Sequence, residues 1–276
     1  MIMKKLLALL LALTFIFTLC ACSTTDDNKD SDGTDKVEAS DKDYIVGKGE
    51  MIIGITYFEP MNFMDDNNEL SGFETEFAKA VCEELGITAK FQEISWTAKE
   101  TELASKNIDC IWNGMTVTPE REDAMSISQH YMKNKQVLVM KADKAADVKN
   151  ADGLTIVAEK ESAGEGVATS DEFFAKADYI AVDTQSKALT EVKSGTADGC
   201  VVDFVCSIGM IGEGTDYEDL VVVDTEAFNE EEYGIAFRKG SDMTDAVNNA
   251  IDKLITSGKL KEIAEKYKLE EQIIVD

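Results

Sequence analysis

The chain has 276 residues, and its 54 acidic side chains outnumber its 27 basic ones, so its formal net charge is −27. A surface this acidic repels nucleic acids and anionic lipid headgroups, so we expect no nucleic-acid partner. The acidic residues are spread along the whole chain, so they favour solubility and say little about a ligand. With one histidine, His130, and no Cys-X-X-Cys spacing, the sequence gives no support for a metal site.

The N-terminal segment is typical of a secretory signal peptide. Lys4 and Lys5 precede an uncharged apolar run, residues 6–19, that is too short to span a bilayer. The sequence Leu-Cys-Ala-Cys that follows resembles the bacterial lipobox, whose last cysteine is lipidated, so we expect residues 1–21 to be removed and Cys22 to carry the anchor. The two acyl chains of a diacylglyceryl group suffice for stable anchoring. The alternative is an ordinary signal peptide cut elsewhere.

The next segment, residues 22–42, is rich in Asp, Ser, Thr and Lys and has few apolar residues. Such a composition cannot offset the entropy lost on ordering, so we expect a disordered tether. The remaining residues, 43–276, are enough for two moderate lobes with cores of their own. The pattern around the body's four cysteines favours buried thiols, although an exported protein could also hold disulfides, and the pairing stays open.

The body of the chain alternates short apolar runs with amphipathic stretches, which favours an α/β fold. A first series ends near residue 140. Its predicted elements are strands at 51–55, 89–94, 108–113 and 136–140, a helix that follows a capping box at Ser71 to Glu74 and ends before Gly86, a helix at 97–105, and a helix that starts at Thr118 and Pro119.

A second series also alternates predicted strands and helices. Its predicted elements are strands at 154–158, 179–182, 200–202, 220–223 and 234–238, and helices at 171–177, 187–193, 243–255 and 260–267, with Gly195 and Gly258 as helix ends. Two such series joined in the middle predict two lobes with a cleft between them, and clefts between lobes are common sites for small ligands.

Four stretches of this sequence resemble the polar amino acid-binding proteins of ABC importers, the bacterial extracellular solute-binding proteins of family 3. They are Gly72-Phe73-Glu74, Ile94-Ser95-Trp96, the run from Asp109 to Arg121, and the run from Glu232 to Gly240. The resemblance covers residues 51–268 and implies a two-lobed, periplasmic-binding-protein-like (type II) fold with a hinge and an interlobe cleft. Residues 43–134 and 234–276 would form lobe 1, and residues 135–233 would form lobe 2.

The resemblance also implies a function. A monomer on the outer face of the bacterial cell membrane would bind a free amino acid between its lobes, without a cofactor, and deliver it to the permease of an ABC importer. We expect a polar or neutral ligand such as glutamine or cystine. The family's aspartate for cationic ligands corresponds to Thr56 here, which disfavours lysine and arginine, whereas Glu161 keeps a basic ligand possible.

Arg121 is the candidate for the ligand carboxylate. It lies in the first turn of a predicted helix, whose N-terminus favours an anion, and a guanidinium can hold a carboxylate with two parallel hydrogen bonds. In the family an arginine at this place has that role, and Thr116, the backbone of Thr118, and Ser162 would add donors. A lone arginine on a helix is otherwise usually solvated.

Asp203 is the candidate for the ligand amino group. It follows the strand 200–202, and a carboxylate at the C-terminal end of a strand faces the crevice of an α/β lobe. The family pattern pairs an aspartate here with the α-amino group, and the backbone near Asn113 and Gly114 would share it. The alternative is that Asp203 caps the next helix.

The remaining candidates would contact the ligand side chain. Trp96 and Phe58 correspond to places where family members have aromatic rings that cover the ligand and exclude water, although core packing is an alternative for each. The other positions assigned to this part of the site are Tyr57, Thr56 and Glu161.

A different function class remains open, because the same fold hosts exported enzymes such as dehydratases that act on amino-acid-like substrates. Such chemistry needs a positioned acid or base, and nothing in the sequence marks Glu59, Glu161 or Asp203 as catalytic. A receptor ectodomain is disfavoured, because no apolar stretch after the leader is long enough to span a membrane.

Overall fold

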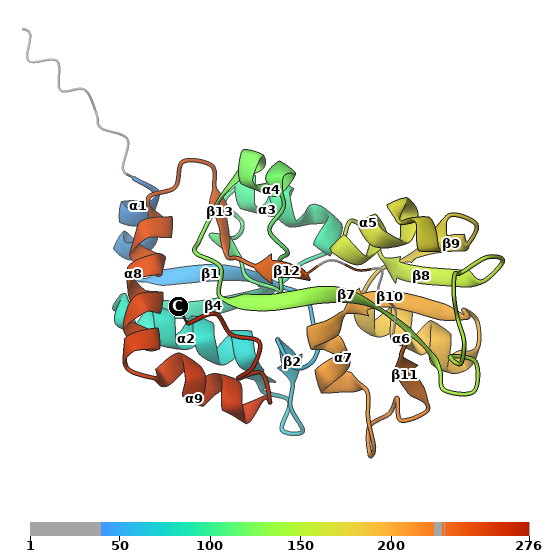
Figure 1. Ribbon diagram of the computed structural model, residues 1–276. Coiled ribbons are helices and arrows are strands. Elements are labelled where there is room, and N and C mark those ends of the chain that lie inside the picture. The colour runs from blue at the N-terminus through green and yellow to red at the C-terminus, as the bar shows by residue number, and fades with distance from the viewer. Residues whose placement is uncertain (1–39, 224–227, 229, 276) are drawn as a thin grey trace, which may run out of the picture. The chain divides into compact units, whose positions relative to one another are not determined.

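The first lobe is built on a five-stranded sheet with the strand order β4-β1-β5-β13-β6 (Figure 1). This computed structural model describes residues 40–223, 228 and 230–275, which fall within one compact unit, Ala39–Asp276. The central strand β1 runs parallel to β4 and β5, whereas β13 is antiparallel to β5 and β6. The strands are β1 (Glu50–Ile55), β4 (Thr88–Glu93), β5 (Cys110–Ile111), β6 (Met125–Ile127) and β13 (Ala236–Arg238).

Helices cover both faces of this sheet. On one face α2 packs against α8 and α9, although α8 and α9 come from the far end of the sequence (Figure 1). The helices of this lobe are α1 (Asp41–Gly47), α2 (Phe73–Glu84), the 3-10 helix η1 (Trp96–Ala98), α3 (Lys99–Ala104), α4 (Pro119–Ala124), α8 (Met243–Thr256) and α9 (Lys259–Lys266). A short hairpin, β2 (Phe63–Met64) and β3 (Leu70–Ser71), precedes α2.

The second lobe is built on a sheet with the order β11-β7-β10-β8-β9. Here β10 is parallel to β8, and β8 is parallel to β9, so these strands end at the same edge. The strands are β7 (Met132–Lys141), β8 (Thr155–Glu159), β9 (Asp178–Val182), β10 (Gly199–Asp203) and β11 (Leu220–Val222). The helices are α5 (Ala163–Ser170), η2 (Glu172–Phe174), α6 (Gln185–Ser194) and α7 (Phe204–Met210).

One long strand, β7, joins the lobes (Figure 1). Its first residues, Met132–Lys135, pair antiparallel with β12 (Glu230–Tyr233), and its later residues, Gln136–Met140, pair with β10. Just beyond Tyr233 the chain returns to the first sheet as β13. The pair β7 and β12 therefore forms a two-stranded connection between the two sheets.

Most predicted elements are present, but the helix at 171–177 and the capping box were wrong. The helix expected at 171–177 is the short η2, because the Asp171 side chain accepts a hydrogen bond from the Phe173 amide and starts a 3-10 turn, while the real helix is α5. The capping box is absent, because Gly72 caps α2 without a side chain and Glu74 points into the core. The strand expected at 234–238 is present but shorter, as β13, and β12 just before it was not predicted.

The structure also answers the question left open about the thiols. The four cysteines of the described part of the chain, Cys82, Cys110, Cys200 and Cys206, are buried and unpaired. None of the described helices is long and apolar enough to cross a membrane. Cys22, the leader and residues 22–39 of the tether predicted at 22–42 lie outside the described residues. The end of that prediction was wrong, because Ser40 caps α1 and the helix already begins at Asp41.

Candidate functional site

A small cavity of about 10 Å³ lies between the lobes. Seven of the ten residues that line it are among those proposed from the sequence: Trp96, Asn113, Gly114, Thr116, Arg121, Ser162 and Asp203. The other three are Glu159, Ala163 and Gln185. The first five of the proposed residues belong to the first lobe and the last two to the second, so both lobes contribute polar groups to one cavity.

Arg121 reaches this cavity from the first turn of α4. Thr118 caps the helix, because its Oγ1 accepts a hydrogen bond from the Arg121 amide at 3.3 Å. The guanidinium donates through Nη1 to the Thr116 carbonyl oxygen at 2.6 Å and through Nη2 to the Glu161 carbonyl oxygen at 3.4 Å. It also lies over the Trp96 ring, with 5.8 Å between Cζ and the ring centroid. Burial lowers the pKa of Arg121, as expected for a guanidinium withdrawn from water.

The turn after β8 faces Arg121 from the second lobe. Glu161 adopts a left-handed backbone with φ of 60°, which few residues other than glycine adopt, and the Glu165 carboxylate holds its amide at 2.6 Å. In this conformation the Glu161 carbonyl accepts hydrogen bonds from both Trp96 and Arg121. Ser162 then begins α5, its Oγ accepting from the Glu165 amide at 3.1 Å. The N-terminus of an eight-residue helix therefore points its partial positive charge at the cavity.

Asp203 lies at the end of β10, opposite Arg121. Its carboxylate accepts hydrogen bonds from Asn134 Nδ2 at 2.8 Å, from Gln136 Nε2 at 2.5 Å and from Gln185 Nε2. Although Asp203 precedes α7, its side chain makes no capping hydrogen bond, so it is directed at these amides. Burial raises the pKa of Asp203, and the three amide donors oppose that rise.

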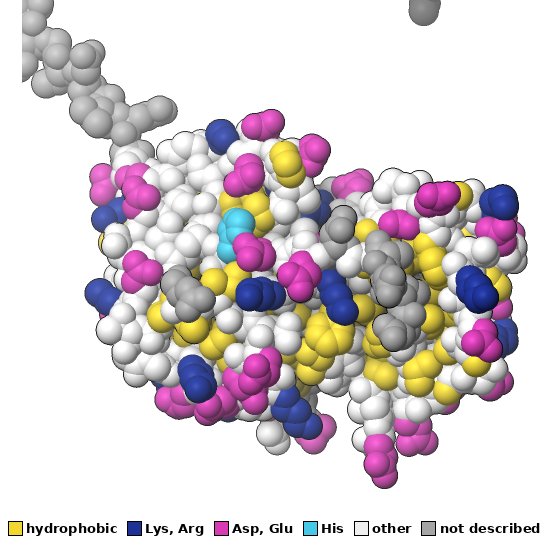
Figure 2. Space-filling model, viewed as in Figure 1, with side chains coloured by type: hydrophobic (Ala, Val, Ile, Leu, Met, Phe, Trp, Pro, Cys, Tyr) yellow, Lys and Arg dark blue, Asp and Glu magenta, His cyan; other side chains and the backbone are white. Residues whose placement is uncertain are grey.

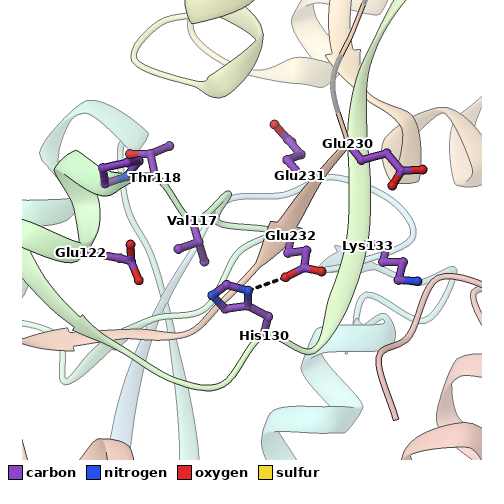
Figure 3. Close-up of a pocket in the computed structure, with 9 residues that line it drawn as sticks. Val117, Thr118, Glu122, His130, Lys133, Glu230, Glu231 and Glu232 are labelled. Carbon is purple, nitrogen blue, oxygen red and sulfur yellow. Dashed lines mark hydrogen bonds and ion pairs between the residues drawn. The ribbon is translucent and has the colours of Figure 1, made fainter. Parts of the chain in front are cut away.

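Glu231, in the connecting strand β12, is a second acid near Asp203, and it is partly buried. Its Oε1 accepts from Thr116 Oγ1 at 2.8 Å and from the same amides of Asn134 and Gln136, at 2.6 and 2.8 Å. The two amides thus bridge Glu231 and Asp203. Burial, and next the charge of Asp203, raise the pKa of Glu231 to about 7. Figure 3 shows the Glu231 side chain pointing away from that of Glu232, as the alternation of a strand requires.

Glu159 ends β8 beside Asp203, on the neighbouring parallel strand. It is 5% exposed and lines the cavity. Within the described part of the chain its Oε1 is buried without a hydrogen-bond partner. Burial first, and then the charge of Asp203, raise the pKa of Glu159 to about 8, while Lys99 lowers it.

Asn113 and Gly114 are held from behind by core residues. The Asn113 side chain accepts from the Thr56 amide at 2.7 Å and donates to Thr56 Oγ1 at 2.6 Å, so its amide is engaged within the first lobe. The Gly114 amide donates to the buried Glu74 carboxylate at 2.7 Å. Gly114 has φ of 53°, and a Cβ there would lie 2.8 Å from Phe58 Cζ. The backbone of this segment is therefore fixed before any ligand is bound.

Five residues proposed from the sequence do not line the interlobe cavity. Phe58 is buried in the core, and the Thr118 hydroxyl is the cap of α4. Thr56 and Tyr57 line a larger neighbouring pocket of about 650 Å³, which also contains Trp96. Glu161 contributes its carbonyl oxygen to the interlobe contact, whereas its carboxylate is about half exposed and lies 3.9 Å from Lys99 Nζ.

A second pocket of about 470 Å³ borders β12, and Glu231 is among the residues that line it (Figure 3). His130 and Glu232 face each other in it, with 2.5 Å between Nδ1 and Oε2, and Glu122 and Glu230 add further acids. Acidic side chains are scattered over both lobes on this face of the molecule rather than gathered here (Figure 2). The pocket contains no polar group that is both buried and unpaired, which distinguishes it from the interlobe cavity.

Sequence reasoning missed the acids and amides that surround Asp203. Glu159 had one available signal, because it is an acid at the end of a buried strand parallel to the one that ends in Asp203. Asn134 and Gln136 are buried polar residues at alternate positions of β7. Alternate residues of a strand point to the same side, so both belong to the side that faces inward. Glu231 stands in a run of three glutamates, where composition gives no indication of which side chain contacts Asn134 and Gln136.

The chain has extensive similarity to known binding proteins. It is 29% identical to the arginine-binding extracellular protein ArtP of Bacillus subtilis (strain 168) over 272 residues, 96% of this chain and 98% of ArtP. It is also 29% identical to the L-cystine-binding protein TcyJ of Escherichia coli (strain K12) over 228 residues, 80% of this chain and 83% of TcyJ.

A solved structure agrees with this similarity. An ABC uptake transporter substrate binding protein from Streptococcus pneumoniae with bound histidine superposes with a TM-score of 0.74 at 30% identity, covering 83% of this chain and 96% of that one. The family model of the bacterial extracellular solute-binding proteins, family 3, matches residues 51–270 of this chain. That span includes both lobes and every residue that lines the interlobe cavity. The chain therefore belongs to the bacterial extracellular solute-binding proteins of family 3.

Proposed function

We propose that this protein captures a free amino acid between its two lobes and delivers it to an ABC importer. One observation carries the proposal: Arg121 and Asp203, of opposite charge and from opposite lobes, line the same buried cavity. A free amino acid carries a carboxylate and an ammonium on one carbon, and both need partners once water is excluded. As a member of a solute-binding family whose matched relatives are named as binding proteins, the chain is a binding protein rather than an enzyme.

In this proposal Arg121 holds the α-carboxylate with two parallel hydrogen bonds, and Thr116, the backbone near Thr118, and Ser162 add donors. Arg121 would exchange its contacts with the Thr116 and Glu161 carbonyls for the charged oxygens of the ligand, since hydrogen bonds between two charged groups are stronger. The positive end of α5 supports the same anion.

Asp203 holds the α-amino group, and the carbonyl groups of Asn113 and Gly114 share it. Asp203 already accepts hydrogen bonds from three amides, which fix its orientation without neutralising its charge. Glu231, held by the same amides, adds negative charge at the same place. A protonated amine is therefore the ligand group that this end of the cavity favours.

The lobes must separate to admit a ligand, because a cavity of about 10 Å³ has room for no more than about one water molecule. The two-stranded connection β7 and β12 is the proposed hinge, with residues 43–134 and 234–276 on one side and 135–233 on the other. A ligand that contacts Arg121 and Trp96 on one lobe and Ser162 and Asp203 on the other stabilises the closed arrangement over the open one.

Cys22 is the proposed site of lipid attachment, and the segment after it would tether the two lobes to the outer face of the cell membrane as a monomer. The relatives named above bind arginine and cystine. From the sequence we proposed a polar or neutral ligand such as glutamine or cystine, and these amino acids belong in the first screen.

The proposal is tested by a thermal-shift screen of residues 23–276 with the common amino acids and cystine, followed by titration calorimetry. A ligand that binds only the folded state raises stability by RT ln(1 + [L]/Kd). Arg121→Ala should weaken binding of every amino acid ligand by at least about 100-fold, because it leaves a buried carboxylate unpaired. Lys261→Ala, which removes an exposed charge on α9, is the control and should bind normally.

If no amino acid in the screen raised the melting temperature of a folded sample, amino-acid binding would be contradicted. Binding that survives Arg121→Ala unchanged would contradict only the carboxylate assignment, and the circular dichroism of that variant shows whether it has folded.

A further inference from the structure

We infer that Glu159 is a specificity residue that binds a second protonated nitrogen in the ligand side chain. This inference rests on the proposed function and adds the chemical class of the ligand: an amino acid with an ammonium or guanidinium group besides its α-amino group. Arginine, lysine and cystine carry such a group, and glutamine and citrulline do not.

The first argument is the contrast between the acids around the cavity. Asp203 and Glu231 each accept three hydrogen bonds from neighbouring amides or hydroxyls. Glu159 is as deeply buried as Asp203, yet the described residues give its side chain no hydrogen bond and no ion pair, and its Oε1 is buried without a partner. Such a group is costly in a folded protein, so a partner is expected from outside the chain.

The second argument is that the nearby cations are engaged elsewhere. Lys99 Nζ donates to the Trp96 carbonyl at 3.3 Å, lies 4.8 Å from the centroid of the Trp96 ring, and has Glu161 as its nearest acid at 3.9 Å. Arg121 contacts two carbonyl groups. Neither forms an ion pair with Glu159, although Lys99 lowers the pKa of Glu159 and Arg121 lines the same cavity.

The third argument concerns which ligand group fits. A neutral amide would satisfy one oxygen of Glu159 but would not stabilise its ionised form, which burial and the charge of Asp203 disfavour. A protonated nitrogen satisfies the oxygen and neutralises the charge together. The α-amino group is already assigned to Asp203 and Glu231, so Glu159 is available for a second cation.

This carboxylate supplies what the first lobe lacks. Thr56, which corresponds to the family's aspartate for cationic ligands, is uncharged and is engaged with Asn113. Glu159 offers a negative charge from the second lobe, so the sequence-based preference for a neutral ligand reverses.

The test compares L-arginine, L-lysine and L-cystine with L-citrulline and L-glutamine by titration calorimetry of residues 23–276. Citrulline has nearly the shape of arginine without its charge. In the unsubstituted protein at least one ligand with a second cation should bind at least about 10-fold more tightly than both neutral ligands. Glu159→Gln should reduce that ratio by at least about 10-fold, whereas the control Glu172→Gln, an exposed acid of the same lobe, should leave it unchanged.

A second readout is proton release. Because burial raises the pKa of Glu159 to about 8, most molecules hold this carboxyl protonated at pH 7, and a bound cation must displace the proton. Calorimetry in buffers of different ionisation enthalpy should show a net release of protons on binding at pH 7. Glu159→Gln should reduce this release, and the part that remains comes from Glu231 and Asp203, whose pKa values are also raised.

The outcomes separate the two proposals. A protein that binds glutamine or citrulline as tightly as the cationic ligands retains the proposed function and overturns this inference. An equal loss for all five ligands in Glu159→Gln also overturns it, because Glu159 would then share the α-amino group with Asp203. Absence of any binding contradicts both.

Discussion

The indole Nε1 of Trp96 donates a 3.1 Å hydrogen bond to the carbonyl oxygen of Glu161, so a ring of the first lobe is fixed to the backbone of the second. The same carbonyl accepts from Arg121, and both donors depend on the left-handed turn at Glu161. This contact favours the closed arrangement directly.

Trp96→Phe keeps an aromatic ring and removes the donor. Because one hydrogen bond contributes about 0.5–1.5 kcal/mol, we expect amino acid affinity to fall by about 2- to 10-fold, with most of the change in a faster dissociation rate. Stopped-flow displacement measures that rate. Unchanged kinetics in a folded Trp96→Phe protein would show that the contact does not influence closure.

Gly114→Ala should destabilise the fold by about 1–3 kcal/mol, because alanine disfavours a φ of 53° and its Cβ would lie 2.8 Å from Phe58. Gly166→Ala is the matched control: nothing lies within 4 Å of a Cβ there, and alanine is the better helix former, so stability should rise by about 0.5–1 kcal/mol. Urea unfolding of both variants measures the difference. Equal stability of the two would contradict the crowding around Gly114.

Without a ligand, the free energy of unfolding should fall as pH rises from about 5 to about 8. Burial raises the pKa of Glu74 and Glu231 to about 7 and that of Glu159 to about 8, from 4.5. The folded state therefore holds protons that the unfolded state has released, and each such carboxyl contributes a slope of about 1.4 kcal/mol per pH unit within its window. Urea unfolding at several pH values measures the slope. In Glu159→Gln the free energy of unfolding should fall less steeply near pH 8, because the carboxyl with the highest of the three pKa values is removed. Stability that rises with pH over this range would contradict these shifts.

Cys22→Ser should abolish labelling of the expressed protein with an alkyne fatty acid and release the protein from the cell surface, because no residue would accept the lipid. Cys20→Ser, two positions earlier, should keep both the label and the anchor. Labelling that persists in Cys22→Ser would show that the lipid is attached at another residue.

The sequence predicted the two lobes and much of the cavity, because the motif from Asp109 to Arg121 combines a strand end, a helix cap and a cation within thirteen residues. It did not predict Glu231 or Glu159. Which glutamate of the run in β12 contacts Asn134 and Gln136 depends on the register of β12 with Met132–Lys135, 95 or more residues away. The absence of a partner for Glu159 depends on which groups Lys99 and Arg121 contact instead. Local patterns contain neither fact.

The wrong helix at 171–177 has a similar cause. Gly164 and Gly166 lower helix propensity at 163–170, yet a side chain at Gly164 would lie 2.9 Å from the Val201 carbonyl, so the glycine is required for close packing against β10. Tertiary packing therefore selected a segment that local propensity disfavours.

If the lobes rotate about β7, the two ends of the cavity move by different amounts. Asn134 and Gln136, which hold Asp203 and Glu231, belong to the proposed pivot itself and move little when the lobes rotate. Trp96 and Glu161 lie on separate lobes away from that strand, so the same rotation separates them farther. Under the proposed roles of Asp203 and Arg121, a ligand that enters the open protein meets an almost complete site for its ammonium group near the connecting strands, and the site for its carboxylate is completed only as the lobes close. The amino end is then engaged first and released last.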